Sequence, residues 1–171
     1  MTIILERLPV SIYLNIITSC VAVPIGFGLG ILAALKKNKL TDGIISTVVV
    51  IFISLPSFVI ITFLLSIFAY QLNWLPSQWP SVQDPISKRV AGYVIPVLAL
   101  SLGTICAYAR WVRAELVDVL ASDFLLLART KGLTRAQSVI RHGLRNSLVP
   151  IFPMLIGEII GILSGSMILE R

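Results

Sequence analysis

The chain contains an uninterrupted uncharged stretch, LPVSIYLNIITSCVAVPIGFGLGILAAL (Leu8–Leu35), which is followed at once by Lys36, Lys37 and Lys39. A helix rises about 1.5 Å per residue, so about 20 apolar residues cross the roughly 30 Å hydrocarbon core of a bilayer. In lipid such a stretch must be helical, because only a helix satisfies its own backbone donors and acceptors within one segment. The stretch therefore predicts a first membrane-spanning helix.

Three further stretches of the chain are long and nearly uncharged: Gly43–Tyr70, Val90–Ala109 and Asn146–Leu169. Only 13% of the 171 residues are charged and 57% are hydrophobic, which is too little charge to cover a water-soluble surface. A soluble helical bundle would show amphipathic stripes, whereas these stretches are apolar almost all round. The sequence predicts an all-α, polytopic bundle of about four spanning helices, with a kink at Pro56.

Most of the 14 lysines and arginines lie in two segments on the same side of the predicted spans. The positive-inside rule places that side in the cytoplasm and the connection Gln71–Arg89 outside. The net charge of +6 does not indicate nucleic-acid binding, because the cations sit in short connections between apolar stretches. The residues of the cytoplasmic side are Lys36, Lys37, Lys39, Arg110, Arg113, Arg129, Lys131, Arg135, Arg141 and Arg145.

The cytoplasmic segment 113–147 predicts two short amphipathic helices joined by a tight turn. Gly132 suits the left-handed position just after a helix end, and Thr134 with Gln137 forms the pattern of a capping box that starts the next helix. An amphipathic piece resting on anionic headgroups is the alternative, but it leaves the turn unexplained. The apolar face of the second helix is predicted to be Ala136, Ile140, Leu144 and Leu148, and the polar face Ser138, Arg141, His142 and Arg145.

Two runs in this segment, DFLLLARTKGL (Asp123–Leu133) and RHGLRNSLVP (Arg141–Pro150), resemble the cytoplasmic signature loop of ABC-transporter permeases of the dipeptide/oligopeptide/nickel type. The chain has Leu126-Leu127-Ala128 in place of the broader family's Glu-Ala-Ala, and Arg145 where many importers have proline, as expected in the peptide branch. The resemblance implies a coupling element that docks on an ATPase, which here comprises Asp123, Ala128, Arg129, Lys131, Gly132, Arg141, Leu144 and Arg145.

The resemblance implies a type I importer permease fold in a bacterial cytoplasmic membrane, with 1–171 as one multi-pass domain of a longer permease. The expected function is that of a transmembrane subunit of an ATP-driven importer for oligopeptides or dipeptides. The expected partners are a second permease, two ABC ATPase subunits, an extracytoplasmic solute-binding protein and the lipid bilayer. A permease for nickel or another small solute, and half of a secondary transporter, remain alternatives.

Polar and small residues inside the spans are candidates for the translocation path and for helix packing. Glu158 is costly in lipid and is expected to face the bundle, either for function or for packing alone. The candidates for the path are Asn15, Ser54, Ser57, Thr104 and Glu158, and those for close helix packing are Gly157, Gly161 and Gly165.

The sequence does not indicate an enzyme, a cofactor or a metal site. It has no glycine-rich phosphate loop with a following Lys-Ser/Thr, so ATP hydrolysis by that chemistry is expected on a partner. An intramembrane enzyme would need paired carboxylates or a nucleophile with its base, and only Glu158 is available. His142, the single histidine, has no carboxylate or cysteine nearby in the sequence.

The predicted topology is tested by single-cysteine labelling in intact cells. A membrane-impermeant thiol reagent is expected to label a cysteine at Gln83 and to leave one at Asn38 unlabelled, because the lysine and arginine asymmetry places them on opposite sides. Protection at Gln83 with labelling at Asn38 would overturn this orientation.

Overall fold

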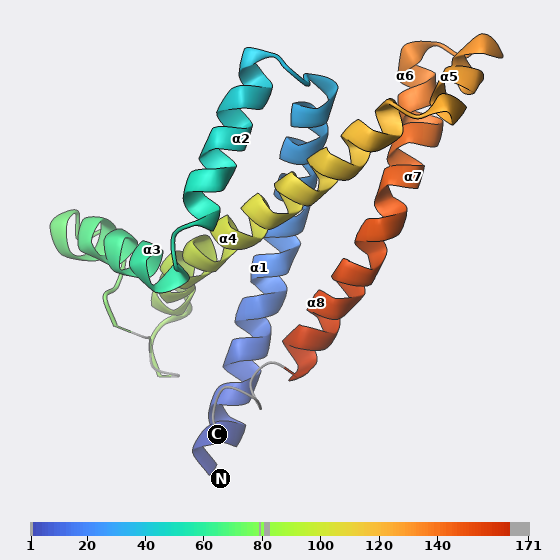
Figure 1. Ribbon diagram of the computed structural model, residues 1–171. Helices are drawn as coiled ribbons and strands as arrows, with labels where there is room; N and C mark the ends of the chain where they lie inside the picture. Colours follow the sequence, from blue (N-terminus) through green and yellow to red (C-terminus); the bar gives the residue numbers. More distant parts are fainter. Residues whose placement is uncertain (1, 79, 81–82, 165–171) are drawn as a thin grey trace.

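The computed structural model describes residues 2–78, 80 and 83–164, and it is helical throughout the spanning parts (Figure 1). The prediction of an all-α fold is confirmed. In chain order the α-helices are α1 (Thr2–Leu35), α2 (Leu40–Ile53), α3 (Ser57–Leu64), α4 (Ile86–Leu120), α5 (Asp123–Thr130), α6 (Arg135–Ser138), α7 (Arg145–Leu148) and α8 (Phe152–Ser164). A π-helical segment, Leu65–Gln71, prolongs α3, another, Val139–Leu144, joins α6 to α7, and a 3₁₀ turn, Val149–Ile151, joins α7 to α8.

Within the described residues, three helical stretches are long and apolar enough to cross a membrane: Ser11–Leu35, Ile86–Leu120 and Arg135–Gly161. The pair formed by α2 and α3 passes the same test if it is counted as one broken span, which gives up to four. The expected number of about four spans is therefore met only with the broken pair included.

The second span is interrupted more sharply than the predicted kink. The axes on the two sides of the break differ by 96°, and α3 turns from the direction of α2 and points away from α1 and α8 (Figure 1). Pro56 lacks a backbone donor and has extended backbone angles, so α2 cannot continue through it. Pro56 cannot donate to the Phe52 carbonyl oxygen, which instead accepts from the backbone N–H of Leu55 at 3.3 Å.

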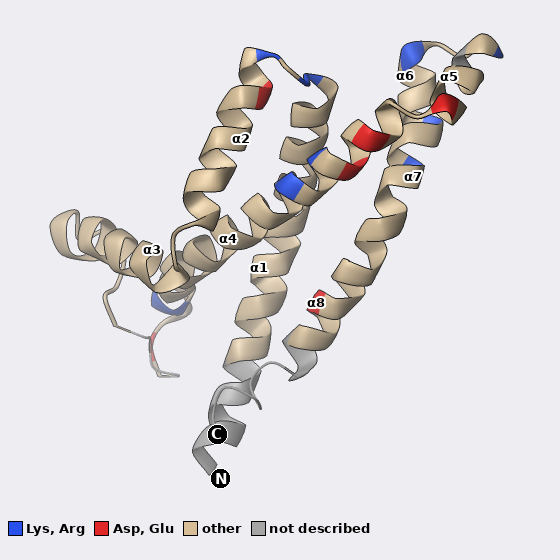
Figure 2. Cartoon of the chain, viewed as in Figure 1, with Lys and Arg blue, Asp and Glu red and all other residues tan. Residues whose placement is uncertain are grey.

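Helix α4 extends beyond the apolar stretch Val90–Ala109 to Leu120, so the cytoplasmic segment begins as a continuous helix. Val112 and Leu116 are fully buried, which shows why the helix continues past the charged residues around them. Figure 2 shows charged residues of both signs along this half of α4 and basic residues near the connection between α1 and α2. The segment predicted to be cytoplasmic thus begins within α4, a helix long and apolar enough to cross a membrane.

The packing of the bundle centres on a seam of small residues between α1 and α4. Gly26 and Gly30 lie so close to α4 that a Cβ atom on Gly30 would stand 2.7 Å from the Cβ of Val112 and 2.7 Å from the carbonyl oxygen of Ala109. Ala22, on the same face, is fully buried. In lipid the driving force for helix association is close van der Waals packing, which small residues permit. Ala22, Gly26 and Gly30 are spaced four residues apart, so they lie on one face of α1.

This seam predicts different effects for the same substitution at two glycines of α1. Gly30→Val should destabilise the bundle by about 1–3 kcal/mol, because the new side chain overlaps the backbone and side chains of α4. Gly28→Val is the matched control, since a Cβ atom there meets nothing within 4 Å. The measurement is thermal unfolding of the purified chain in detergent, and equal midpoints for the two variants would contradict the seam.

Candidate functional site

The turn between α5 and α6 has the geometry predicted from the sequence. Gly132 has φ +90°, the left-handed region that favours glycine. The backbone N–H of Leu133 donates to the carbonyl oxygen of Ala128 at 3.4 Å, which closes the end of α5. The capping box is present, with the Thr134 N–H donating to Gln137 Oε1 at 3.0 Å and the Gln137 N–H donating to Thr134 Oγ1 at 3.3 Å. Both flanks of the turn are therefore fixed by hydrogen bonds.

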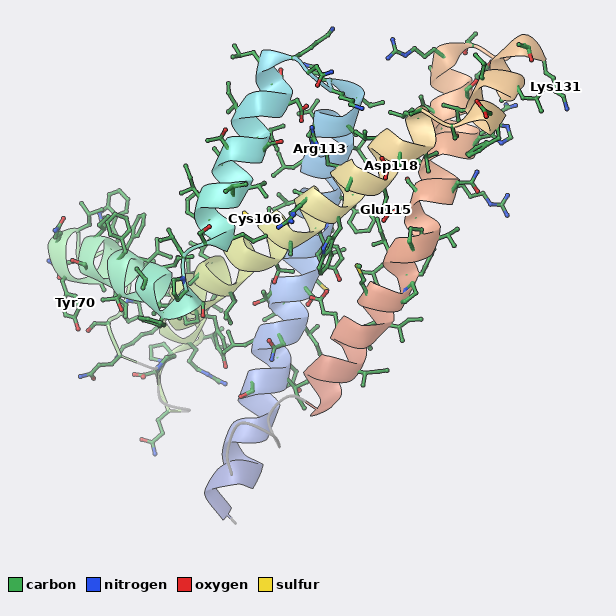
Figure 3. The ribbon with its side chains drawn as sticks, in the orientation of Figure 1. Tyr70, Cys106, Arg113, Glu115, Asp118 and Lys131 are labelled. Atoms are coloured by element: carbon green, nitrogen blue, oxygen red, sulfur yellow. The ribbon has the colours of Figure 1, made fainter. Side chains whose placement is uncertain are left out.

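Some of the predicted docking residues of this segment are exposed, and others are buried or half-buried. Ala128 is buried and Leu144 is half-buried, so these two hold the segment against the end of the bundle. Figure 3 shows Lys131 at the outer end of the segment. Arg129 lies in α5, and its side chain is outside the described part of the structure. The exposed members are Asp123, Lys131, Gly132, Arg141 and Arg145.

The predicted apolar face of the second short helix is wrong in part. Ser138 and Val139 are buried, whereas Ala136 is exposed and Ile140 is 65% exposed. The cause is the π-helical segment Val139–Leu144, whose wider turn rotates the buried face away from the α-helical pattern. Ser138, expected on the polar face, is fully buried, and no hydrogen-bond partner is found for its hydroxyl among the described residues.

Glu158, on α8, is bound by hydroxyl groups from two other spanning helices. Ser19 of α1 donates to Glu158 Oε1 at 2.6 Å, and Tyr108 of α4 donates to Glu158 Oε2. The Tyr108 ring packs against Phe27 and edge-on against Trp111, whose centroid lies 5.4 Å away. The carboxylate faces the bundle as expected, and its hydrogen bonds join three helices.

The other candidates for the translocation path are only partly brought together. Thr104 and Glu158 line the same open pocket, of about 360 Å³. Asn15 is half-buried and precedes Ser19 by one turn of α1. Ser54 lies exposed at the break between α2 and α3, and its hydroxyl donates to the Val50 carbonyl oxygen at 2.8 Å, while Ser57 is exposed just beyond the break.

The glycines predicted to form a packing ridge in the last span have no close neighbour among the described residues. Within that part of the chain, a Cβ atom on Gly157 or Gly161 would meet nothing within 4 Å, and both residues are exposed. Gly165 lies outside the described residues. Close packing of another helix on this ridge stays a prediction, while the observed close packing uses Gly26 and Gly30 instead.

The sequence analysis missed an ion pair that joins α2 to α4. Arg113 donates from Nε to Asp42 Oδ1 at 2.5 Å and from Nη2 to Asp42 Oδ2 at 2.8 Å. Asp42 also accepts from the backbone N–H of Asn38 at 3.0 Å and from the Ser46 hydroxyl at 3.3 Å. The aspartate is buried, and Figure 3 shows Arg113 on the upper half of α4. One carboxylate therefore connects the turn after α1, the start of α2 and the cytoplasmic half of α4.

Comparison with known proteins identifies the family to which the chain belongs. Residues 26–170 match the family described as the inner membrane component of binding-protein-dependent transport systems. The chain belongs to this family. It is accordingly a multi-pass protein of the inner membrane, and the resemblance to peptide-type ABC permeases drawn from the cytoplasmic segment is confirmed.

The family includes relatives that align along nearly the whole chain. The dipeptide transport system permease protein DppB of Lactococcus lactis subsp. cremoris is 37% identical over 171 residues, which is 99% of this chain and 54% of the relative. The oligopeptide transport system permease protein OppB of Haemophilus influenzae is 35% identical over 98% of this chain and 53% of its own length. The glutathione transport system permease protein GsiC of Shigella flexneri is 33% identical over 98% and 53%. The chain thus spans about half the length of these relatives.

The ion pair between α2 and α4 predicts a loss of stability on neutralisation of its acid. Asp42→Asn leaves Arg113 without its charged partner, and hydrogen bonds to charged groups contribute on the order of 1–3 kcal/mol. The Arg113 side chain is 32% exposed, so the loss should be smaller than the about 3–5 kcal/mol of a fully buried pair. Thermal unfolding in detergent measures it. Asp118→Asn, an exposed carboxylate on α4, is the control, and an equal loss in both variants would refute the role of the pair.

Proposed function

We propose that this chain is part of the transmembrane permease subunit of an ATP-driven importer for oligopeptides or dipeptides. The relatives named above support a peptide as the solute, since their names refer to dipeptide, oligopeptide and glutathione transport. The observation that carries the proposal is the rigid, exposed turn at Gly132, held by hydrogen bonds on both flanks and mounted on a helix that crosses the membrane.

The proposal requires partner subunits. The spans of this chain are too few to enclose a polar path wide enough for a peptide, so a second permease is expected to complete it. The chain has no phosphate-binding loop, so two ATPase subunits are expected to bind the cytoplasmic segment 113–147 and to hydrolyse ATP. An extracytoplasmic solute-binding protein would deliver the peptide, in agreement with the description of the family.

The mechanism that we propose is a lever between the cytoplasmic segment and the spans. ATPase closure would push on the exposed residues Lys131, Arg141 and Arg145, whose support is the buried Ala128. Only two residues separate α5 from the end of α4, so a displacement of the segment is passed to α4. Because α4 packs against α1 through the glycine seam, the displacement would move both helices together, as in rocking transitions of transporters.

The lever predicts that the backbone conformation at Gly132 is needed for coupling. Gly132→Val should abolish peptide-stimulated ATPase activity, because a β-branched residue at positive φ is strained by roughly 1–3 kcal/mol and displaces the turn. Gly132→Asn is the matched variant, since asparagine adopts positive φ far more readily, and it should retain most of the stimulation. The measurement is ATPase activity of the full-length permease reconstituted with its partner subunits.

Membrane insertion and complex recovery are measured for each variant, so that a folding defect is recognised. Normal stimulation and normal peptide uptake with Gly132→Val would contradict a coupling role for the turn. An equal loss of stimulation in Gly132→Val and Gly132→Asn would show that any side chain at this position blocks coupling. The left-handed backbone conformation would then not be the cause.

A further inference from the structure

Glu158 is a carboxylate inside a spanning segment without a cationic partner in the described residues. The described ion pairs are Lys88–Asp84 and Arg113–Asp42, and neither involves Glu158. Its two hydrogen bonds come from neutral hydroxyl groups, those of Ser19 and Tyr108. The arrangement therefore lacks a positive charge. An acidic side chain at membrane depth is costly and marks a candidate binding site.

The space beside this carboxylate suits a small organic cation. Glu158 lines an open pocket of about 360 Å³ together with Thr104, Ala107, Tyr108, Trp111 and Met154. The volume lies within the range of about 300–1,000 Å³ that small-molecule sites occupy. The rings of Tyr108 and Trp111 both line this space, and they meet edge-on at an interplanar angle of 84°. Aromatic faces attract ammonium groups, and the attraction increases when water is excluded.

We propose that this pocket binds an ammonium group, namely the protonated amino terminus of a peptide. Glu158 would supply the opposite charge, Ser19 and Tyr108 would hold its carboxylate in place, and Trp111 would cover the cation. Every unmodified peptide carries this group whatever its sequence, so such a site would accept many peptides while rejecting those with a blocked amino terminus. The proposal rests on the proposed function, because it names the part of the solute that this chain recognises.

The test is a binding measurement on the full-length permease, assembled with its partner permease and ATPase subunits in lipid nanodiscs without the solute-binding protein. Binding is measured by isothermal titration calorimetry, which needs no reporter residue in the permease or in its partner subunits. The probes are Ala-Ala-Ala-amide and N-acetyl-Ala-Ala-Ala-amide, which differ in the charged amine. We expect the free amine to bind about 10- to 100-fold more tightly, as one charge-assisted contact provides.

Two substitutions of acidic residues distinguish the site from a general effect of charge. Glu158→Gln keeps an oxygen that accepts from Ser19 or Tyr108 but removes the charge, so the preference for the free amine should fall to about onefold while the complex still assembles. Glu115→Gln is the control, because it removes a carboxylate of α4 that does not line the pocket. This variant should keep the full preference for the free amine. Equal affinities for the two probes in the unsubstituted permease, or an unchanged preference in Glu158→Gln, would overturn the proposal.

Peptide-stimulated ATPase activity of the same preparation, measured with the solute-binding protein added, separates this proposal from the one on which it rests. ATPase stimulation by peptide without a preference for the free amine would support the importer function and would overturn the ammonium site. A preference abolished by Glu158→Gln in a permease that shows no stimulation supports the site and contradicts the importer.

Discussion

The close approach of α1 and α4 is the contact on which the rest of the structure depends. Lipid offers no hydrophobic gain for bringing two apolar helices together, so the contact has to come from surfaces that fit closely. Gly26 and Gly30 remove side chains where the α4 backbone passes, and the fully buried Val112 and the nearly buried Tyr108 fill the space beside them. Residues separated by about 80 positions in the sequence thereby form one unit that crosses the membrane.

Helix α4 connects the parts of the molecule to which we assign roles. Its middle carries Tyr108, which binds Glu158, and its cytoplasmic half carries Arg113, which binds Asp42. Its end lies directly before α5 and the Gly132 turn. A force on the turn is therefore expected to reach the carboxylate and α2 through the same helix, and Figure 1 shows α4 crossing between the other spans. The Gly132 turn and the ammonium site would then be coupled through the part of α4 between Tyr108 and Leu120.

The sequence predicted the features that depend on neighbouring residues. The Gly132 turn and the Thr134–Gln137 capping box are local, because each depends on residues within a few positions of one another. The sequence did not predict contacts between distant positions, such as Asp42 with Arg113 or the partners of Glu158. Patterns among neighbouring residues do not indicate which distant residues they contact. The buried position of Ser138 was missed because a π-helical turn changes the periodicity from which faces are read. The 96° break at Pro56 exceeds a proline kink, since a proline marks where a helix ends but not the direction of the next one.

The account depends most directly on the register of the α1–α4 seam, and paired cysteines in the membrane test it. Cys20 and Cys106 are first replaced by alanine, and cross-linking by a short bifunctional thiol reagent is then compared for two pairs, Phe27→Cys with Tyr108→Cys and Gly28→Cys with Tyr108→Cys. The structure predicts efficient cross-linking of the first pair, because the rings of Phe27 and Tyr108 lie 5.7 Å apart between centroids, and little or none of the second, because a Cβ atom on Gly28 meets nothing within 4 Å among the described residues. Cross-linking of the second pair as readily as the first, or of neither, would contradict the seam and the arrangement of helices built on it.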